Sequence, residues 1–66
     1  MFHIRYEGRT FEIKPRVFEL STQANDRDIM RRVSDWLGVP ESGLRNYVVD
    51  RRPSGDVVVR PEAIFG

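Results

Sequence analysis

The sequence predicts a small α+β domain in which one helix covers a sheet made of two β-hairpins. An amphipathic helix with a start and a stop signal occupies residues 26–37. Alternating apolar and polar segments joined by turn residues flank it on both sides. The expected order is therefore strand, strand, helix, strand, strand, and 66 residues suit one domain spanning 1–66.

The first hairpin is expected at residues 2–6 and 9–13, which alternate around Glu7 and Gly8. A two-residue loop there places four apolar side chains on one face: Phe2, Ile4, Phe11 and Ile13. The opposite face receives compatible polar pairs: His3 with Glu12, and Arg5 with Thr10.

Residues 14–20 continue from this hairpin toward the helix. Pro15 would interrupt strand pairing because it has no backbone N–H. We expect a strand extension or an irregular connection here, with Phe18 and Leu20 tucked beneath the helix.

The helix has an apolar stripe along one side and both ends marked. The stripe consists of Ile29, Met30, Val33, Trp36 and Leu37, and the polar side of Arg27, Asp28, Arg31, Ser34 and Asp35. Asn25 or Asp26 can cap the first turn, Gly38 suits the left-handed position after the last turn, and Pro40 prevents continuation. We expect the whole stripe, Trp36 included, to pack in the core.

The second hairpin is expected at residues 47–50 and 57–60. Pro53 and Ser54 suit a type I turn, and Gly55 suits the left-handed bulge that follows. The inward face then carries Tyr47, Val49, Val57 and Val59. Three consecutive valines at 57–59 predict burial on both faces, as in a central strand.

The last six residues, 61–66, can form a terminal helical turn with Pro61 in its first position. Two roles are open for Ile64 and Phe65: they close the core, or they form a tail that docks on a partner.

Residues Gly38-Val39-Pro40, a short loop containing Leu44 and a strand starting near Asn46 resemble the helix-to-strand passage of ubiquitin-like β-grasp proteins. The resemblance implies a four-stranded sheet with the helix on one face. It does not extend to the C-terminus, because Gly66 follows Phe65 and the terminal Gly-Gly of that family is missing.

An alternative resemblance is to helix-turn-helix and winged-helix domains. It uses the spacing of Val33, Ser34, Leu37, Gly38, Val39, Leu44 and Tyr47, with residues 51–60 as a wing. Under it, Ser42, Arg45 and Asn46 lie on a DNA-recognition helix, and Arg51 and Arg52 contact phosphates. Local chemistry favours the first interpretation, since Gly43 is a poor helix former and the Tyr47-Val48-Val49 run prefers strand.

Composition narrows the function classes. The formal net charge is +1, from eleven basic and ten acidic residues, which is not the footprint of a strong non-specific nucleic-acid binder. The chain has no cysteine, so disulfides and thiol chemistry are excluded. No signal peptide or membrane span is recognisable, and we expect a cytoplasmic location.

Catalytic chemistry is not indicated. His3 is the one histidine, the serines have no evident activating partner, and the carboxylates are scattered. The sequence therefore predicts neither an enzyme nor a metal or cofactor site.

The function expected from the β-grasp interpretation is a protein–protein interaction module. The sheet face away from the helix would be exposed, with small apolar residues bordered by arginines, a combination that suits a binding surface. The candidate partner-binding residues are Arg5, Val48, Asp50, Val58 and Arg60. The partner is another protein or a second copy of this chain, and nucleic acid belongs to the helix-turn-helix alternative alone.

Overall fold

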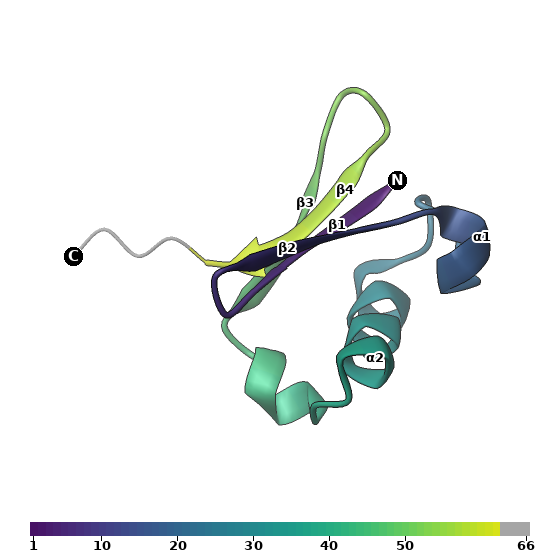
Figure 1. Ribbon diagram of the computed structural model, residues 1–66. Coiled ribbons are helices and arrows are strands. Elements are labelled where there is room, and N and C mark those ends of the chain that lie inside the picture. The colour runs from purple at the N-terminus through teal and green to yellow at the C-terminus, as the bar shows by residue number, and fades with distance from the viewer. Residues whose placement is uncertain (63–66) are drawn as a thin grey trace.

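The computed structural model describes residues 1–62, in which a four-stranded sheet is combined with helical segments (Figure 1). The strands are β1 (Phe2–Tyr6), β2 (Arg9–Ile13), β3 (Tyr47–Arg51) and β4 (Val57–Pro61). The helical segments are α1 (Pro15–Phe18), α2 (Asp26–Leu37) and the 3-10 turn η1 (Glu41–Leu44). The predicted α+β class and the order of the main elements are confirmed, and α1 and η1 are short additions.

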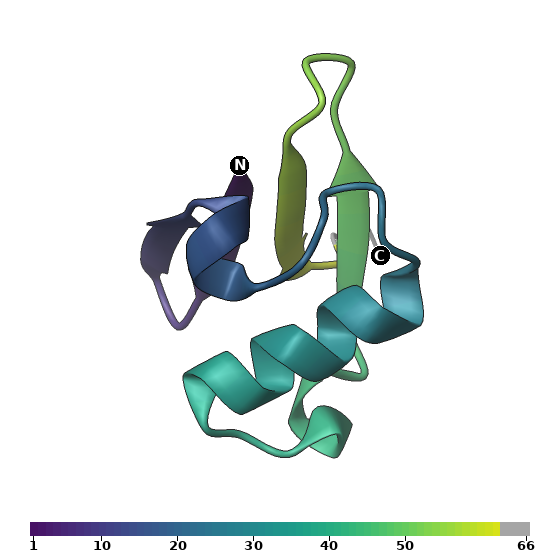
Figure 2. The same cartoon turned by 90° about the vertical axis from the view of Figure 1, so that its right-hand side faces the viewer.

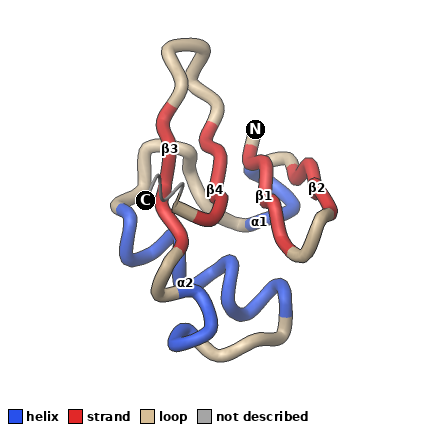
Figure 3. The backbone as a smooth tube through the Cα atoms, turned by 90° about the vertical axis from the view of Figure 1, so that its left-hand side faces the viewer, coloured by secondary structure: helices blue, strands red, loops and turns tan. Residues whose placement is uncertain are grey.

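The strands lie side by side in the order β2-β1-β4-β3 (Figure 3). Both hairpins are antiparallel, whereas β1 and β4 run parallel in the centre of the sheet. The first and last strands therefore pair directly, with Phe2 opposite Val57 and Ile4 opposite Val59.

Both hairpins have the registers that the alternation predicts. In the first, Ile4 is opposite Phe11, and the turn residues Glu7 and Gly8 have φ values of 50° and 76°. Positive φ at both positions is the signature of a type I′ turn, whose twist matches that of the strands. In the second, Val49 is opposite Val59, and Gly55 takes the left-handed position with φ of 93°.

Helix α2 begins and ends where its sequence indicates. The Asn25 side chain accepts a hydrogen bond from the Asp28 backbone N–H at 2.8 Å. Gly38 has a φ of 72°, and the Val39 N–H bonds the Ser34 carbonyl at 3.1 Å. Ser34, expected on the polar side, is buried, and its hydroxyl donates to the Val39 carbonyl, so the buried polar group has a partner.

The core lies between the sheet and the helical layer. It contains Phe2, Ile4, Ile13, Phe18, Ile29, Val33, Leu44, Val57 and Val59. β4 is buried on both faces, as its valine run predicts.

Two expectations about the helical layer are wrong. Trp36 is 42% exposed instead of buried, because it lies at the margin of the layer, where its ring meets Phe11 edge-on. Residues 15–18 form the helical turn α1 in place of a strand extension or an irregular connection, since Pro15 fits the first position of a helix. Phe18 is buried as expected.

Residues 41–50 do not form a second helix. They contain the single turn η1 and then β3, which pairs with β4 over its whole length. The helix-turn-helix interpretation is therefore wrong, and the β-branched residues of β3 explain why. Pro61 ends β4 and does not begin a helix, while Ile64 and Phe65 lie outside the described residues.

Candidate functional site

The candidate site is the sheet face that points away from the helices. α1 and α2 lie on the same side of the sheet, and no element within residues 1–62 lies over the other side (Figures 1 and 2). Because side chains alternate along each strand, this outer sheet face carries a defined set: His3, Arg5, Thr10, Glu12, Val48, Asp50, Val58 and Arg60.

The strand register brings four of the five predicted partner-binding residues together. Val48 is opposite Arg60, and Asp50 is opposite Val58, across the β3–β4 pair. Arg5 lies on β1, beyond β4, and is exposed.

Val58 is buried, as the valine run predicts, so it does not add to the exposed apolar patch that we expected on the outer sheet face. It is 7% exposed, and its strand neighbours are His3 on β1 and Asp50 on β3. Val48 is only half-buried. The accessible apolar part of the outer sheet face is therefore smaller than predicted and lies at Val48.

Charged side chains hold a fixed arrangement beside Val48. One oxygen of the Asp50 carboxylate, Oδ2, lies 3.3 Å from Arg60 Nε and 3.1 Å from a terminal nitrogen of Arg52. Two guanidinium groups share one carboxylate, so this cluster carries an excess of positive charge. It forms a basic border to the apolar spot.

A second charged cluster lies near the start of β1. The His3 ring is 3.8 Å from both Glu12 and Asp56, so the predicted contact with Glu12 is present. The Met1 ammonium group donates to Asp56 at 3.0 Å. This hydrogen bond is the main reason that the pKa of Asp56 is held below its ordinary value. The role of Asp56 was missed, since the parallel β1–β4 pairing that brings it to Met1 is long-range.

The residues of the DNA-binding alternative do not lie on a recognition helix. Ser42, Arg45 and Asn46 are exposed on or just after η1. Arg51 instead holds the segment that precedes α2. Its guanidinium donates to the carbonyls of Thr22 at 2.9 Å and Ala24 at 2.6 Å, and to Asp26 Oδ1 at 2.8 Å.

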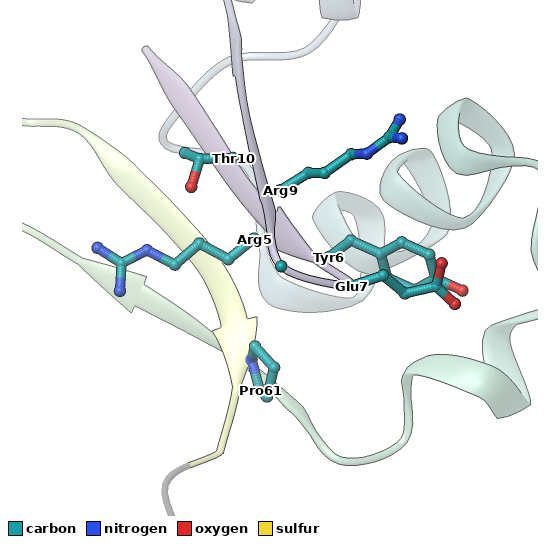
Figure 4. A pocket seen from close by; sticks show the side chains of 7 residues that line it. Arg5, Tyr6, Glu7, Arg9, Thr10 and Pro61 are labelled. Carbon is teal, nitrogen blue, oxygen red and sulfur yellow. The ribbon is translucent and has the colours of Figure 1, made fainter.

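A depression of about 320 Å³ lies at the turn between β1 and β2 (Figure 4). Arg5 and Arg9 both line it, but their guanidinium groups project to opposite sides of the hairpin. The alternation of the strands causes this, because Arg5 belongs to the outer sheet face and Arg9 to the helix side. The two charges therefore do not converge on one ligand.

A separate surface with two exposed apolar side chains, bordered by Glu19, Arg32 and Asp35, lies on the helix side. Val17 is 62% exposed and Trp36 is 42% exposed, and both border a groove of about 250 Å³. The Phe11 and Trp36 rings have centroids 5.1 Å apart and are inclined at 70°. Sequence reasoning missed this surface because it assigned Trp36 to the core.

Within residues 1–62, no group of three or more histidine or acidic side chains is placed to hold a metal ion. In the same part of the chain, every helix is too short or too polar to cross a bilayer. Comparison of the chain with models of protein families, with curated proteins and with solved structures found no match.

Proposed function

We propose that this chain is a small non-catalytic protein-binding module of the β-grasp class that acts in the cytoplasm. The observation that carries the proposal is the one-sided cover of the sheet. The helical segments bury one face, and the outer sheet face is left with Val48 beside the Asp50 cluster.

The β-grasp assignment is supported by more than the order of elements. The central strands β1 and β4 are parallel, each hairpin adds one antiparallel strand outside them, and α2 packs on one face. The Gly38-Val39-Pro40 passage that suggested the resemblance ends α2 in a left-handed turn.

The chemistry of the outer sheet face indicates the kind of partner. Arg52 and Arg60 share Asp50, and Arg5 is exposed on the same face. A partner that presents carboxylates around one apolar side chain would complement this pattern. Arginine is enriched in protein interfaces relative to the rest of the protein surface.

Affinity capture with Val48→Asp tests the proposal. This change adds a negative charge to the half-buried apolar spot, so proteins captured by the parent chain should be lost. Val17→Asp is the matched control, since it makes the same substitution at an exposed site on the helix side. Val58 is unsuitable because its burial would confuse loss of binding with loss of folding.

Thermal unfolding of each variant confirms that it is folded. If the folded Val48→Asp chain captures the same proteins as the parent, the outer sheet face is not the binding surface.

A further inference from the structure

The outer edge of β2 presents backbone groups without a pairing strand in residues 1–62. The Val57 N–H donates to the Met1 carbonyl at 3.0 Å, so Met1, His3 and Arg5 direct their backbone groups toward β4. The residues of β1 that lie between these three therefore direct their backbone groups toward β2. On β2, their hydrogen-bond partners are Phe11 and the residues two positions away on either side. It follows that the N–H and C=O groups of Thr10 and Glu12 point away from the sheet.

This edge lacks two of the features that commonly block strand addition, a proline and a bulge. β2 contains no proline, and its five residues pair regularly with β1 without a bulge. An unpaired edge of this kind is a template for a further strand. Trp36, which is 42% exposed and packs against Phe11 of β2, borders the same edge on the helix side.

We propose that a second copy of this chain pairs with β2, through an antiparallel β2–β2 contact about a two-fold axis at Phe11. In this register all five residues of each strand face the other strand. Thr10 of one copy then exchanges backbone hydrogen bonds with Glu12 of the other, and the two Phe11 side chains lie opposite each other. A shift that centres the pair on Glu12 would put two carboxylates face to face, which is unfavourable.

Charge complementarity supports a second copy as the occupant. Across the outer sheet face, Arg5 is opposite Thr10, and Thr10 would be opposite Glu12 of the second copy. Strands lie about 4.8 Å apart, so the extended Arg5 side chain can cross Thr10 to reach that carboxylate. Arg5 has no ion pair within residues 1–62, and the Glu12 side chain, which lies 3.8 Å from the His3 ring, is still 66% exposed. The two-fold axis would form this pair twice.

The helix side contributes the apolar part of the contact. Phe11 is half-buried in the single chain, and Trp36 packs edge-on against it while remaining 42% exposed. Pairing of the two β2 strands places the Phe11 and Trp36 rings of both copies next to one another, along the helix side of the contact. Burial of this surface would favour association, as apolar area is removed from water.

Sedimentation velocity of the full chain from micromolar to millimolar concentration tests the proposal. The parent chain should change from monomer to dimer as concentration rises. In the same samples, the Thr10 and Glu12 amides should become protected from hydrogen exchange. A chain that stays monomeric throughout, or a dimer in which these amides stay unprotected, would overturn the proposal.

Thr10→Pro removes one outward N–H without removing a hydrogen bond to β1, so the folded variant should remain monomeric. Persistence of the dimer in this variant, folded by circular dichroism, would place the interface elsewhere.

The register can also be tested by exchanging charges, a test that does not require β2 to accept a proline. Arg5→Glu and Glu12→Arg should each raise the dimer dissociation constant by about tenfold, through like-charge repulsion. The double variant should restore the parent value, and a failure to restore it would contradict the register.

Val48→Asp is the control that separates this inference from the proposed function. It should leave the dimer intact, because Val48 lies on β3, at the far side of the sheet. Loss of the dimer in this variant would move self-association to the outer sheet face.

Discussion

The two edge strands of the sheet have equal length but different neighbours. On β3, Arg51 donates two hydrogen bonds to the segment before α2, at Thr22 and Ala24, and a third to Asp26, the first residue of α2. That segment passes beside β3 in Figure 2. β2 has no comparable long-range hydrogen bond in the part of the chain that the structure describes, and the half-exposed Trp36 lies nearby. A single arginine thus ties β3 to the start of the helical layer, and β2 has no such tie within residues 1–62.

The largest expected effect on stability comes from removing the side-chain hydrogen bonds that distinguish β3 from β2. Arg51→Ala removes all three hydrogen bonds and should lower the free energy of unfolding by about 1–2 kcal/mol, a figure discounted for the exposure of the side chain. Urea unfolding measures it. Arg52→Ala is the control, since Arg52 makes a single exposed ion pair with Asp50 and should cost less than about 0.5 kcal/mol. Equal losses in the two variants would contradict the special role of Arg51.

A smaller effect concerns the hairpin that carries β2. Glu7 occupies a left-handed position with φ of 50°, which is costly for most residues and tolerated by asparagine. Glu7→Asn should raise the free energy of unfolding by about 0.5–1 kcal/mol, because Asn-Gly is a preferred type I′ turn. Glu7→Gln should have no such effect, since glutamine does not share this tolerance. Chemical denaturation of the three chains distinguishes the outcomes.

The smallest expected effect concerns Asp56, in the turn that follows β3. The Met1 ammonium group lowers the pKa of Asp56 in the folded chain. The unfolded chain then binds this proton more readily, so the contribution is complete above the ordinary pKa and is lost as pH falls through the folded value. Asp56→Asn should therefore flatten the dependence of the melting temperature on pH below about pH 4. If the melting temperature of the variant depends on pH as that of the parent does, the ion pair between Met1 and Asp56 contributes no measurable stability.

Local rules predict the elements whose determinants are adjacent in sequence. The Glu7-Gly8 turn, the Gly55 bulge and the two ends of α2 all depend on residues within a few positions of one another. Their registers and caps were therefore predictable. Residues 15–18 were not, because Pro15 suits either a strand margin or the first turn of a helix, and Phe18 was expected to be buried in both cases.

The candidate site was only partly predictable for a different reason. Alternation places Val48, Asp50, Val58 and Arg60 on one face, and the structure agrees. Exposure depends on the neighbouring strand, however, and β4 lies between β1 and β3, so Val58 is covered on both sides. The exposure of Trp36 depends in the same way on how far the helical layer extends beyond β2.

The parallel pairing of β1 with β4 has a mechanical consequence. Tension applied between residues 1 and 62 would pull these neighbouring strands in opposite directions along their length. All the hydrogen bonds between them would be loaded together in shear, and they could not open one after another as a zipper does. Resistance to stretching in this direction should therefore exceed the resistance to peeling either hairpin away from the sheet.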